Sequence, residues 1–246
     1  MKNLEQMIQQ NKNLEFGTKN YKCDKCKDLE FILYKDEKGI TISKQCECFK
    51  INQSQRRLER TSLFAKKDEY TFEKYIPENE WQKGILEKAK KYAKEASGWF
   101  FIGGQPGAGK THICTAILRN LSYIHNLSYE YILFNQKMTE LKQWKYDEKL
   151  KYTEELNRLI NTNILFIDDL FKVQPTNADL DILFDVINSR YLNNSICIIS
   201  SEKYINDICK IDEAIGSRIY EKSKENLINI KLDKNKDYRL KNSSML

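Results

Sequence analysis

The segment Gly104–Thr111 reads G-Q-P-G-A-G-K-T and constrains the fold of this chain more than any other feature. By average composition, the pattern G-x-x-x-x-G-K-T arises by chance in a chain of this length with a probability of about 1%. An apolar, strand-like run at Trp99–Ile102 precedes it, and helical periodicity over Lys110–Ile124 follows. A glycine loop between a strand and a helix turns backbone N–H groups and the helix N-terminus toward an anion. The segment therefore predicts a phosphate-binding loop.

An acidic pair follows the next strongly apolar segment. Ile164–Ile167 has the pattern of a buried strand and is followed by Asp168 and Asp169. Open α/β sheets bind ligands at the carboxyl ends of their strands, so we expect both acids beside the phosphate loop. Thr111 and Asp168 are predicted to hold Mg²⁺, and Asp169 to orient or deprotonate an attacking water. The predicted nucleotide-binding residues are Gly104, Gln105, Pro106, Gly107, Ala108, Gly109, Lys110, Thr111 and Asp168.

The length of the Asp169 side chain affects the expected rate of hydrolysis. Asp169 is one methylene shorter than a glutamate at the same position would be. We therefore expect slow turnover, no faster than the ~10 s⁻¹ typical of enzymes.

Strand-like and helix-like segments alternate along this half of the chain. The alternation predicts an α/β fold with a mainly parallel sheet covered by helices on both faces. The expected strands are Trp99–Ile102, Tyr129–Phe134, Ile164–Ile167, Ile196–Ser200 and Leu227–Leu232. The expected helices are Gly84–Ala96, Lys110–Ile124, Gln136–Ile160 as one stretch or two pieces, Ala178–Leu192, Tyr204–Lys210 and Glu213–Lys222.

A change in composition divides the chain. Between residues 50 and 70 the sequence becomes polar and charged, and Gln53–Arg60 fits a helix or a linker. We expect a small N-terminal module over residues 1–60, a nucleotide-binding domain over 61–232 and a flexible basic tail over 233–246.

Composition excludes several classes of protein. Three Pro and nine Gly are few for an all-β sandwich, and no run approaches the ~20 apolar residues of a membrane span. The first residues form no apolar export signal, so we expect a cytoplasmic protein without a membrane partner. The 41 Lys and Arg against 35 Asp and Glu give a net charge of +6. Because these charges are interleaved, they fit either a solvated surface or a basic path for nucleic acid.

Four of the seven cysteines lie in one short stretch, as Cys23-x-x-Cys26 and Cys46-x-Cys48. Four soft ligands at this spacing suit tetrahedral Zn²⁺ in a reducing compartment, with an iron–sulfur cluster or unliganded thiols as alternatives. The intervening residues fit a β-hairpin that turns near Asp36–Gly39, as a small zinc ribbon requires. Four thiolates and Zn²⁺ together carry a charge of −2, which offsets the nearby lysines and favours a folded adaptor over a DNA clamp.

Four segments resemble the AAA+ ATPase core by their order and spacing. They are the phosphate loop, Ile164–Asp169, the strand end Ile198–Glu202, and Ile215–Glu221. With the cysteine module in front, the set is similar to the DnaC/DnaI-type replicative helicase loaders of bacteria and phages, the DnaI side especially. The resemblance covers about residues 70–232. It implies the AAA+ strand order, ATP as the nucleotide, and self-association in a spiral where one subunit's arginine completes its neighbour's site. That arginine is Arg218 here.

Two departures from the family's pattern affect this expectation. The family's strand end commonly reads Thr-Ser-Asn, with the polar residue sensing the terminal phosphate, whereas this chain has Ser200-Ser201-Glu202. Because a carboxylate would repel that phosphate, we expect Ser201 to be the sensor or the site to hydrolyse weakly. In addition, only Asp233–Leu246 follows the last expected strand, so no C-terminal helical lid is expected, as the resemblance implies for loaders.

The resemblance implies an ATP-dependent loader of a hexameric replicative helicase onto single-stranded DNA, in which residues 1–60 bind the helicase. Alternatives are an IstB-type transposition ATPase and a nucleotide-binding adaptor without turnover. Phe72 and Tyr75 lie where this family's nucleotide base is approached, but they fit core aromatics equally well.

Cations and aromatics alternate over Asn135–Ile160, which fits either a strand-tracking DNA surface or an amphipathic helix packed on the sheet. The candidate DNA contacts there and in the loop after the acidic pair are Lys137, Lys142, Trp144, Lys145, Tyr146, Lys149, Lys151, Tyr152, Phe171 and Lys172.

Overall fold

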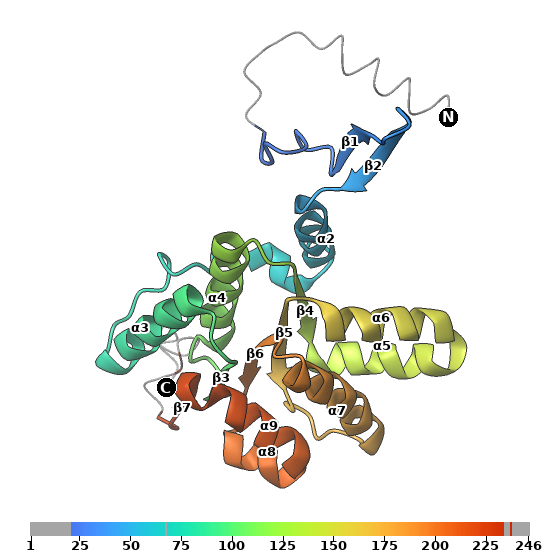
Figure 1. Cartoon of the computed structure of the whole chain (residues 1–246). Coiled ribbons are helices and arrows are strands. Elements are labelled where there is room, and N and C mark those ends of the chain that lie inside the picture. The colour runs from blue at the N-terminus through green and yellow to red at the C-terminus, as the bar shows by residue number, and fades with distance from the viewer. Residues whose placement is uncertain (1–20, 67, 234–236, 238–246) are drawn as a thin grey trace. The chain divides into compact units, whose positions relative to one another are not determined.

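The computed structural model describes residues 21–66, 68–233 and 237 (Figure 1). The chain forms two compact units, residues 1–49 and residues 50–246. The first unit ends eleven residues before the module boundary expected near residue 60. The predicted tail over 233–246 lies outside the described residues, apart from Asp233 and Asp237.

The described part of the first unit contains an antiparallel hairpin. Strands β1 (Phe31–Lys35) and β2 (Thr41–Gln45) pair along their whole length. At the turn, Asp36 Oδ1 accepts the backbone N–H of Ile40 at 2.8 Å, and Gly39 takes the left-handed conformation, with φ of 76°. These contacts confirm the hairpin and the position of its turn.

The second unit is built on a five-stranded sheet whose neighbouring strands are all parallel. The strand order is β4-β5-β6-β3-β7, so the first strand of the sheet lies between the fourth and the fifth. The strands are β3 (Phe100–Gly104), β4 (Tyr129–Leu133), β5 (Ile164–Leu170), β6 (Ile196–Ser201) and β7 (Leu227–Ile230). The predicted parallel α/β class is confirmed.

Helices connect the strands. They are α2 (Cys48–Leu58), α3 (Glu80–Glu95), α4 (Lys110–His125), α5 (Phe134–Asp147), α6 (Lys149–Asn161), α7 (Asn177–Leu192), α8 (Ile205–Ile211) and α9 (Glu213–Ser223), with 3-10 turns at Ser62–Lys66 and Lys224–Asn226. Helix α3 begins earlier than its periodicity predicts, because Gln82 Oε1 accepts the N–H of Asn79 and caps the helix start. The expected stretch Gln136–Ile160 is two helices that break at Glu148 and lie side by side (Figure 1).

Side chains of the sheet alternate between two apolar layers. Phe100 and Ile102 face the layer formed with α3 and α4, whereas Phe101 faces the layer formed with α5 to α9. All three side chains are fully buried. Because the sheet is parallel and closed on both faces, its polar residues gather where the strands end. The pairing of Ser201 with both Gly103 and Leu170 brings the carboxyl ends of β3, β5 and β6 to one edge.

Candidate nucleotide-binding site and cysteine centre

The phosphate loop leaves the sheet at the end of β3. Gly104 has φ of 127°, and a Cβ there would lie 2.2 Å from the carbonyl oxygen of Ile230, so only glycine fits. Gly109 precedes the first turn of α4 with φ of 80°. The loop between them therefore leads directly into the N-terminus of α4, where backbone N–H groups can bind an anion, as the sequence predicts.

The loop lysine is held inside the loop. Lys110 Nζ donates to the carbonyl oxygens of Gly104 at 2.8 Å and Gln105 at 2.7 Å, and the residue is 6% exposed. Burial lowers the pKa of Lys110, and the neighbouring carboxylates Glu202 and Asp169 oppose that shift. The ammonium can exchange these carbonyl oxygens for phosphate oxygens without leaving the loop.

Three hydroxyl groups converge on Asp168. Thr111 Oγ1 donates to Asp168 Oδ1 at 3.1 Å, Tyr131 donates to Oδ2 at 3.2 Å, and Ser200 Oγ donates to Oδ1. Burial raises the pKa of the Asp168 carboxyl, and these hydrogen bonds oppose the shift. A carboxylate beside a threonine hydroxyl is the oxygen donor set that Mg²⁺ prefers, so Thr111 and Asp168 fit the predicted metal ligands.

Asp169 is more exposed than Asp168, and it is paired with Lys172, a contact that the sequence did not predict. Its carboxylate accepts from Lys172 Nζ at 2.8 Å, and the same ammonium lies 3.5 Å from Glu202 Oε1. These hydrogen bonds raise the pKa of Lys172, the contact with Asp169 most of all. The loop after β5 thus adds a cation to two carboxylates.

A cavity of about 470 Å³ lies at this edge of the sheet. Its walls are formed by Tyr70, Lys74, Tyr75, Ile76, Glu78, Pro106, Gly107, Ala108, Gly109, Lys110, Thr111, His112, Asp169, Lys172 and Glu202. One end is aromatic, and the other carries Asp169 of β5 together with Lys172 and Glu202, which follow β5 and β6. Tyr75 and Phe72 both belong to the core cluster with α3 and α4, and only Tyr75 also lines the cavity.

Sequence reasoning missed two residues of the aromatic end. Tyr70 stacks on His112 with ring centroids 4.9 Å apart, and Tyr75 meets the same imidazole edge-on at 5.2 Å. His112 Nε2 lies 2.8 Å from the carbonyl oxygen of Thr71 and so ties this segment to α4. In the sequence, only the position of His112, two residues after the loop lysine, indicated that it could lie near the nucleotide site.

The four clustered cysteines meet in the first unit. All four Sγ atoms lie within 4.8 Å of one another, with Cys23 and Cys46 at 3.7 Å and Cys26 and Cys48 at 3.4 Å. A tetrahedral zinc with bonds of about 2.3 Å separates its sulfurs by about 3.8 Å, whereas disulfide sulfurs lie about 2.05 Å apart. The donor set therefore fits zinc.

Backbone contacts shape the first knuckle of this centre. Asp28 accepts the N–H of Cys23 at 2.8 Å, and Lys27 N–H donates to the Cys23 carbonyl at 2.9 Å. A hydrogen bond from the Cys26 backbone is the main cause that lowers the pKa of Cys23, to about 7. Burial instead raises the pKa of Cys26 and of Cys48, so the thiolate form that a metal requires is favoured at Cys23 and opposed at these two.

Comparison with known proteins identifies the family. The family described as the bacterial DnaA ATPase domain matches residues 66–222. The chain belongs to this family of AAA+ ATPase domains. It is 30% identical over 234 residues to the phage-like element PBSX protein XkdC of Bacillus subtilis, covering 89% of this chain and 86% of XkdC.

The DnaC/DnaI-type resemblance is confirmed as well. The replicative helicase loader DnaC of Escherichia coli is 27% identical over 139 residues, 55% of this chain and 56% of DnaC. The crystal structure of a DnaC helicase loader matches with a TM-score of 0.58 at 19% identity, over 68% of this chain and 99% of that one. The AAA+ fold of the second unit is thus shared with these proteins.

Ser201, the predicted phosphate sensor of the AAA+ domain, does not line the cavity. Its hydroxyl is fully buried, donates to the carbonyl oxygen of Leu170 at 2.6 Å and accepts the N–H of Lys203 at 3.0 Å. Glu202 lines the cavity instead. The alternation of side chains along β6 and its extension explains this, because adjacent residues face opposite ways.

Arg218, the predicted trans-acting arginine, lies on α9. Its guanidinium donates to Asn188 Oδ1 at 3.0 Å and to the carbonyl oxygen of Ala214 at 2.8 Å, and it lies 5.1 Å from the ring centroid of Phe184. The side chain does not line the nucleotide cavity of its own chain. The side chain is half-buried between α9 and α7.

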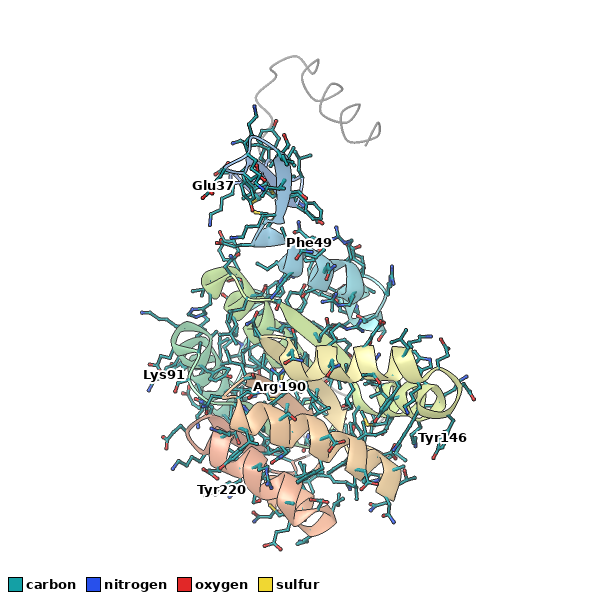
Figure 2. All side chains as sticks on the ribbon, turned by 45° about the vertical axis from the view of Figure 1, so that its right-hand side comes forward. Glu37, Phe49, Lys91, Tyr146, Arg190 and Tyr220 are labelled. Atoms are coloured by element: carbon teal, nitrogen blue, oxygen red, sulfur yellow. The ribbon has the colours of Figure 1, made fainter. Side chains whose placement is uncertain are left out.

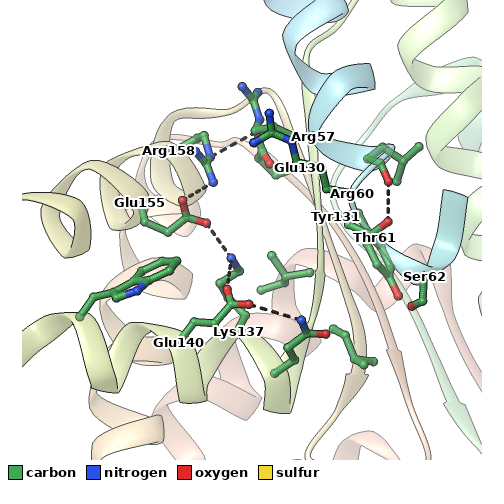
Figure 3. Close-up of a pocket in the computed structure, with 15 residues that line it drawn as sticks. Arg57, Arg60, Thr61, Ser62, Glu130, Tyr131, Lys137, Glu140, Glu155 and Arg158 are labelled. Carbon is green, nitrogen blue, oxygen red and sulfur yellow. Dashed lines mark hydrogen bonds and ion pairs between the residues drawn. The ribbon is translucent and has the colours of Figure 1, made fainter. Parts of the chain in front are cut away.

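A second cavity of about 520 Å³ borders the edge strand β4, the C-terminal part of α2 and the hairpin α5–α6 (Figure 3). A chain of ion pairs crosses it. Glu130 contacts Arg57 and Arg158, and Lys137 Nζ lies 2.9 Å from Glu155 and 2.7 Å from Glu140. Because its acids are paired with its cations, this cavity is not a simple anion site.

Several candidate DNA contacts are structural. Lys137 is paired within the second cavity, Lys142 Nζ lies 2.7 Å from Asp179, and Trp144 and Tyr152 pack against the core. Phe171 is fully buried against Phe134, so its assignment to DNA is wrong.

Tyr146 is 85% exposed at the far end of α5 (Figure 2). Lys145, Lys149 and Lys151 are exposed nearby, although Lys151 Nζ also bonds Glu148 at 3.2 Å. These side chains remain available to a nucleic acid.

Across the part of the chain that the structure describes, no helix has the length and apolar content to cross a membrane.

Proposed function

We propose that this chain is an ATP-dependent loader that places a hexameric replicative helicase on single-stranded DNA during DNA replication in the cytoplasm. The observation that carries the proposal is the nucleotide cavity of an AAA+ domain, which the phosphate loop and Thr111 line, with the buried Asp168 hydrogen-bonded to Thr111. The similarity to the replicative helicase loader DnaC supports the biological role.

In the proposed reaction, the loop N–H groups and Lys110 bind the phosphates, and Thr111 with Asp168 holds Mg²⁺. When bound, Mg²⁺ would neutralise phosphate charge. Asp169 orients or deprotonates the attacking water, after Lys172 moves from its carboxylate. Because the short side chain of Asp169 is already held by Lys172, hydrolysis is slow.

Self-association completes the site in this proposal. Arg218 leaves its contacts with Asn188 and Ala214 and reaches the terminal phosphate bound by an adjacent subunit. Hydrolysis therefore depends on assembly, and its timing sets the release of the helicase.

The N-terminal unit is proposed to hold zinc through Cys23, Cys26, Cys46 and Cys48 and to bind the helicase. Its hairpin exposes apolar side chains that a folded unit of this size would ordinarily bury. They are Phe31, Ile32, Leu33, Tyr34 and Ile42. An exposed apolar surface of this kind suits a protein partner more than a nucleic acid.

Hydrolysis by the full chain tests the enzymatic half of the proposal. We expect slow ATP turnover, no faster than about 10 s⁻¹, that rises with single-stranded DNA and is lost in Lys110→Ala. Glu202 in the cavity favours one competitor, an adaptor that binds nucleotide without turnover. Tight binding of ATP with no hydrolysis at any DNA or protein concentration would select that adaptor.

A further inference from the structure

The nucleotide cavity contains an acid that a phosphate site should exclude. Glu202 lines its charged end together with Asp169. Two carboxylates facing a triphosphate of like charge repel it, and the repulsion is strongest at the terminal phosphate, where charge is densest. A cation must therefore offset them for ATP to bind well.

Two lysines of the lining lie near these acids, Lys110 in the phosphate loop and Lys172, and of the two only Lys172 forms ion pairs with them. Lys172 lies within reach of both acids, at 2.8 Å from Asp169 Oδ2 and 3.5 Å from Glu202 Oε1. Lys110 is turned toward the carbonyl oxygens of its own loop, and Lys74 comes from the segment that carries the aromatic end. Of the lysines that line the cavity, only Lys172 forms ion pairs both with Asp169 at the end of β5 and with Glu202 after β6.

The backbone fixes this position. Asp169 and Phe171 both adopt left-handed conformations, with φ of 55° and 54°, which cost free energy for residues other than glycine. The fully buried ring of Phe171 anchors the turn, and Lys172 N–H donates to the Asp169 carbonyl at 3.2 Å. The loop therefore returns toward β6 immediately after β5 and presents Lys172 to Glu202.

The side chain keeps enough freedom to change partners. Lys172 is 45% exposed, and its flexible stem carries three donors on one ammonium. One donor can take a phosphate oxygen while another stays with Glu202.

We infer that Lys172 binds the terminal phosphate of ATP and that Glu202 positions it, so that the pair distinguishes a bound triphosphate from a diphosphate. The inference deepens the proposed function and rests on nucleotide binding in this cavity. Glu202 is then a positioning residue and not an obstacle, because its charge holds the ammonium at the end of the cavity where the terminal phosphate lies.

Binding measurements on the full chain test the pair without relying on turnover. Dissociation constants for the non-hydrolysable triphosphate AMP-PNP and for ADP, both with Mg²⁺, are compared by titration calorimetry. We expect Lys172→Gln to weaken AMP-PNP binding at least about tenfold and ADP binding less than about twofold, since only the triphosphate loses a charged hydrogen bond. Lys210→Gln is the matched control, because it removes the same charge from an exposed lysine that also pairs with an aspartate three residues away but does not line the cavity.

A second variant tests the coupling. In a Glu202→Gln background, we expect the penalty of Lys172→Gln on AMP-PNP binding to shrink several-fold, because the unpaired carboxylate that repels the phosphate is gone. Equal losses for AMP-PNP and ADP in Lys172→Gln, or a loss no larger than that of Lys210→Gln, would overturn the inference. If the wild-type chain binds neither nucleotide, the proposed function fails as well, which separates the two failures.

Discussion

The hydroxyl of Tyr131 donates a hydrogen bond of 3.2 Å to Asp168 Oδ2, and this contact joins the edge strand β4 to the predicted magnesium ligand. Tyr131 also lines the second cavity, beside Glu130 and Lys137. One side chain thus borders both that cavity and the carboxylate expected to hold the metal.

Tyr131→Phe tests whether this hydrogen bond supports metal binding. We expect the Mg²⁺ concentration for half-maximal ATP binding to rise about tenfold, because Asp168 loses one of the donors that orient it. Tyr129→Phe, on the same strand, is the control and should leave the Mg²⁺ dependence unchanged. An unchanged dependence in Tyr131→Phe would show that Thr111 and Ser200 suffice.

The cysteine centre should be required for the first unit and dispensable for the second. A two-stranded hairpin is marginally stable by itself, so the unit depends on its metal. We expect Cys26→Ser to lose the bound zinc and to become protease-sensitive over residues 21–49 while still binding nucleotide. Cys114→Ser, a fully buried cysteine of the second unit, should keep one zinc per chain. Zinc content measured by mass spectrometry decides between these outcomes.

Arg218 should act across a subunit boundary. We expect Arg218→Ala to lower kcat for ATP about 10³-fold with little change in nucleotide affinity, whereas Lys222→Ala on the same helix should have a small effect. Mixing Arg218→Ala with Lys110→Ala chains should restore part of the activity, because one supplies an intact pocket and the other an intact arginine. No recovery at any mixing ratio would argue against action in trans.

Asp179 should make the stability of the second unit depend on acid pH. Burial opposes ionisation, but hydrogen bonds from Lys142 and Thr176 outweigh it and lower the pKa of Asp179. A lowered folded-state pKa means that the stabilisation is complete above the unfolded pKa of about 4 and is lost as pH falls through the folded value.

We therefore expect Asp179→Asn to cost about 1 kcal/mol of unfolding free energy at pH 7, from the weakened helix cap and ion pair. The difference from wild type should narrow as pH falls below about 4. Urea denaturation at several pH values measures it. If the difference in unfolding free energy between the two proteins stays constant with pH, the carboxylate charge of Asp179 contributes nothing to stability.

Local signals predicted much of the site. The glycine pattern with its flanking strand and helix identified the phosphate loop, and the apolar run before Asp168 located the acid at a strand end. Cysteine spacing found all four members of the cluster, because each pair lies close in sequence.

Contacts between distant segments could not be predicted in this way. Lys172 meets Glu202 only because β5 and β6 are adjacent, and a sequence read segment by segment does not give that order. Arg190 shows the same limit. Its charge predicts a surface residue, yet it is fully buried and donates to the carbonyl oxygens of Leu159 and Thr162, both at 2.8 Å, just where α6 ends.

In the proposed function, ATP controls the binding of this chain to a replicative helicase. Native mass spectrometry of the full chain mixed with the replicative helicase of its host, with and without ATP, measures this binding and reports zinc content in the same spectra. We expect a zinc-loaded complex that forms with ATP and is lost in Lys110→Ala. A chain that does not bind the helicase in either condition, or that binds it equally with and without nucleotide, would contradict the proposed function.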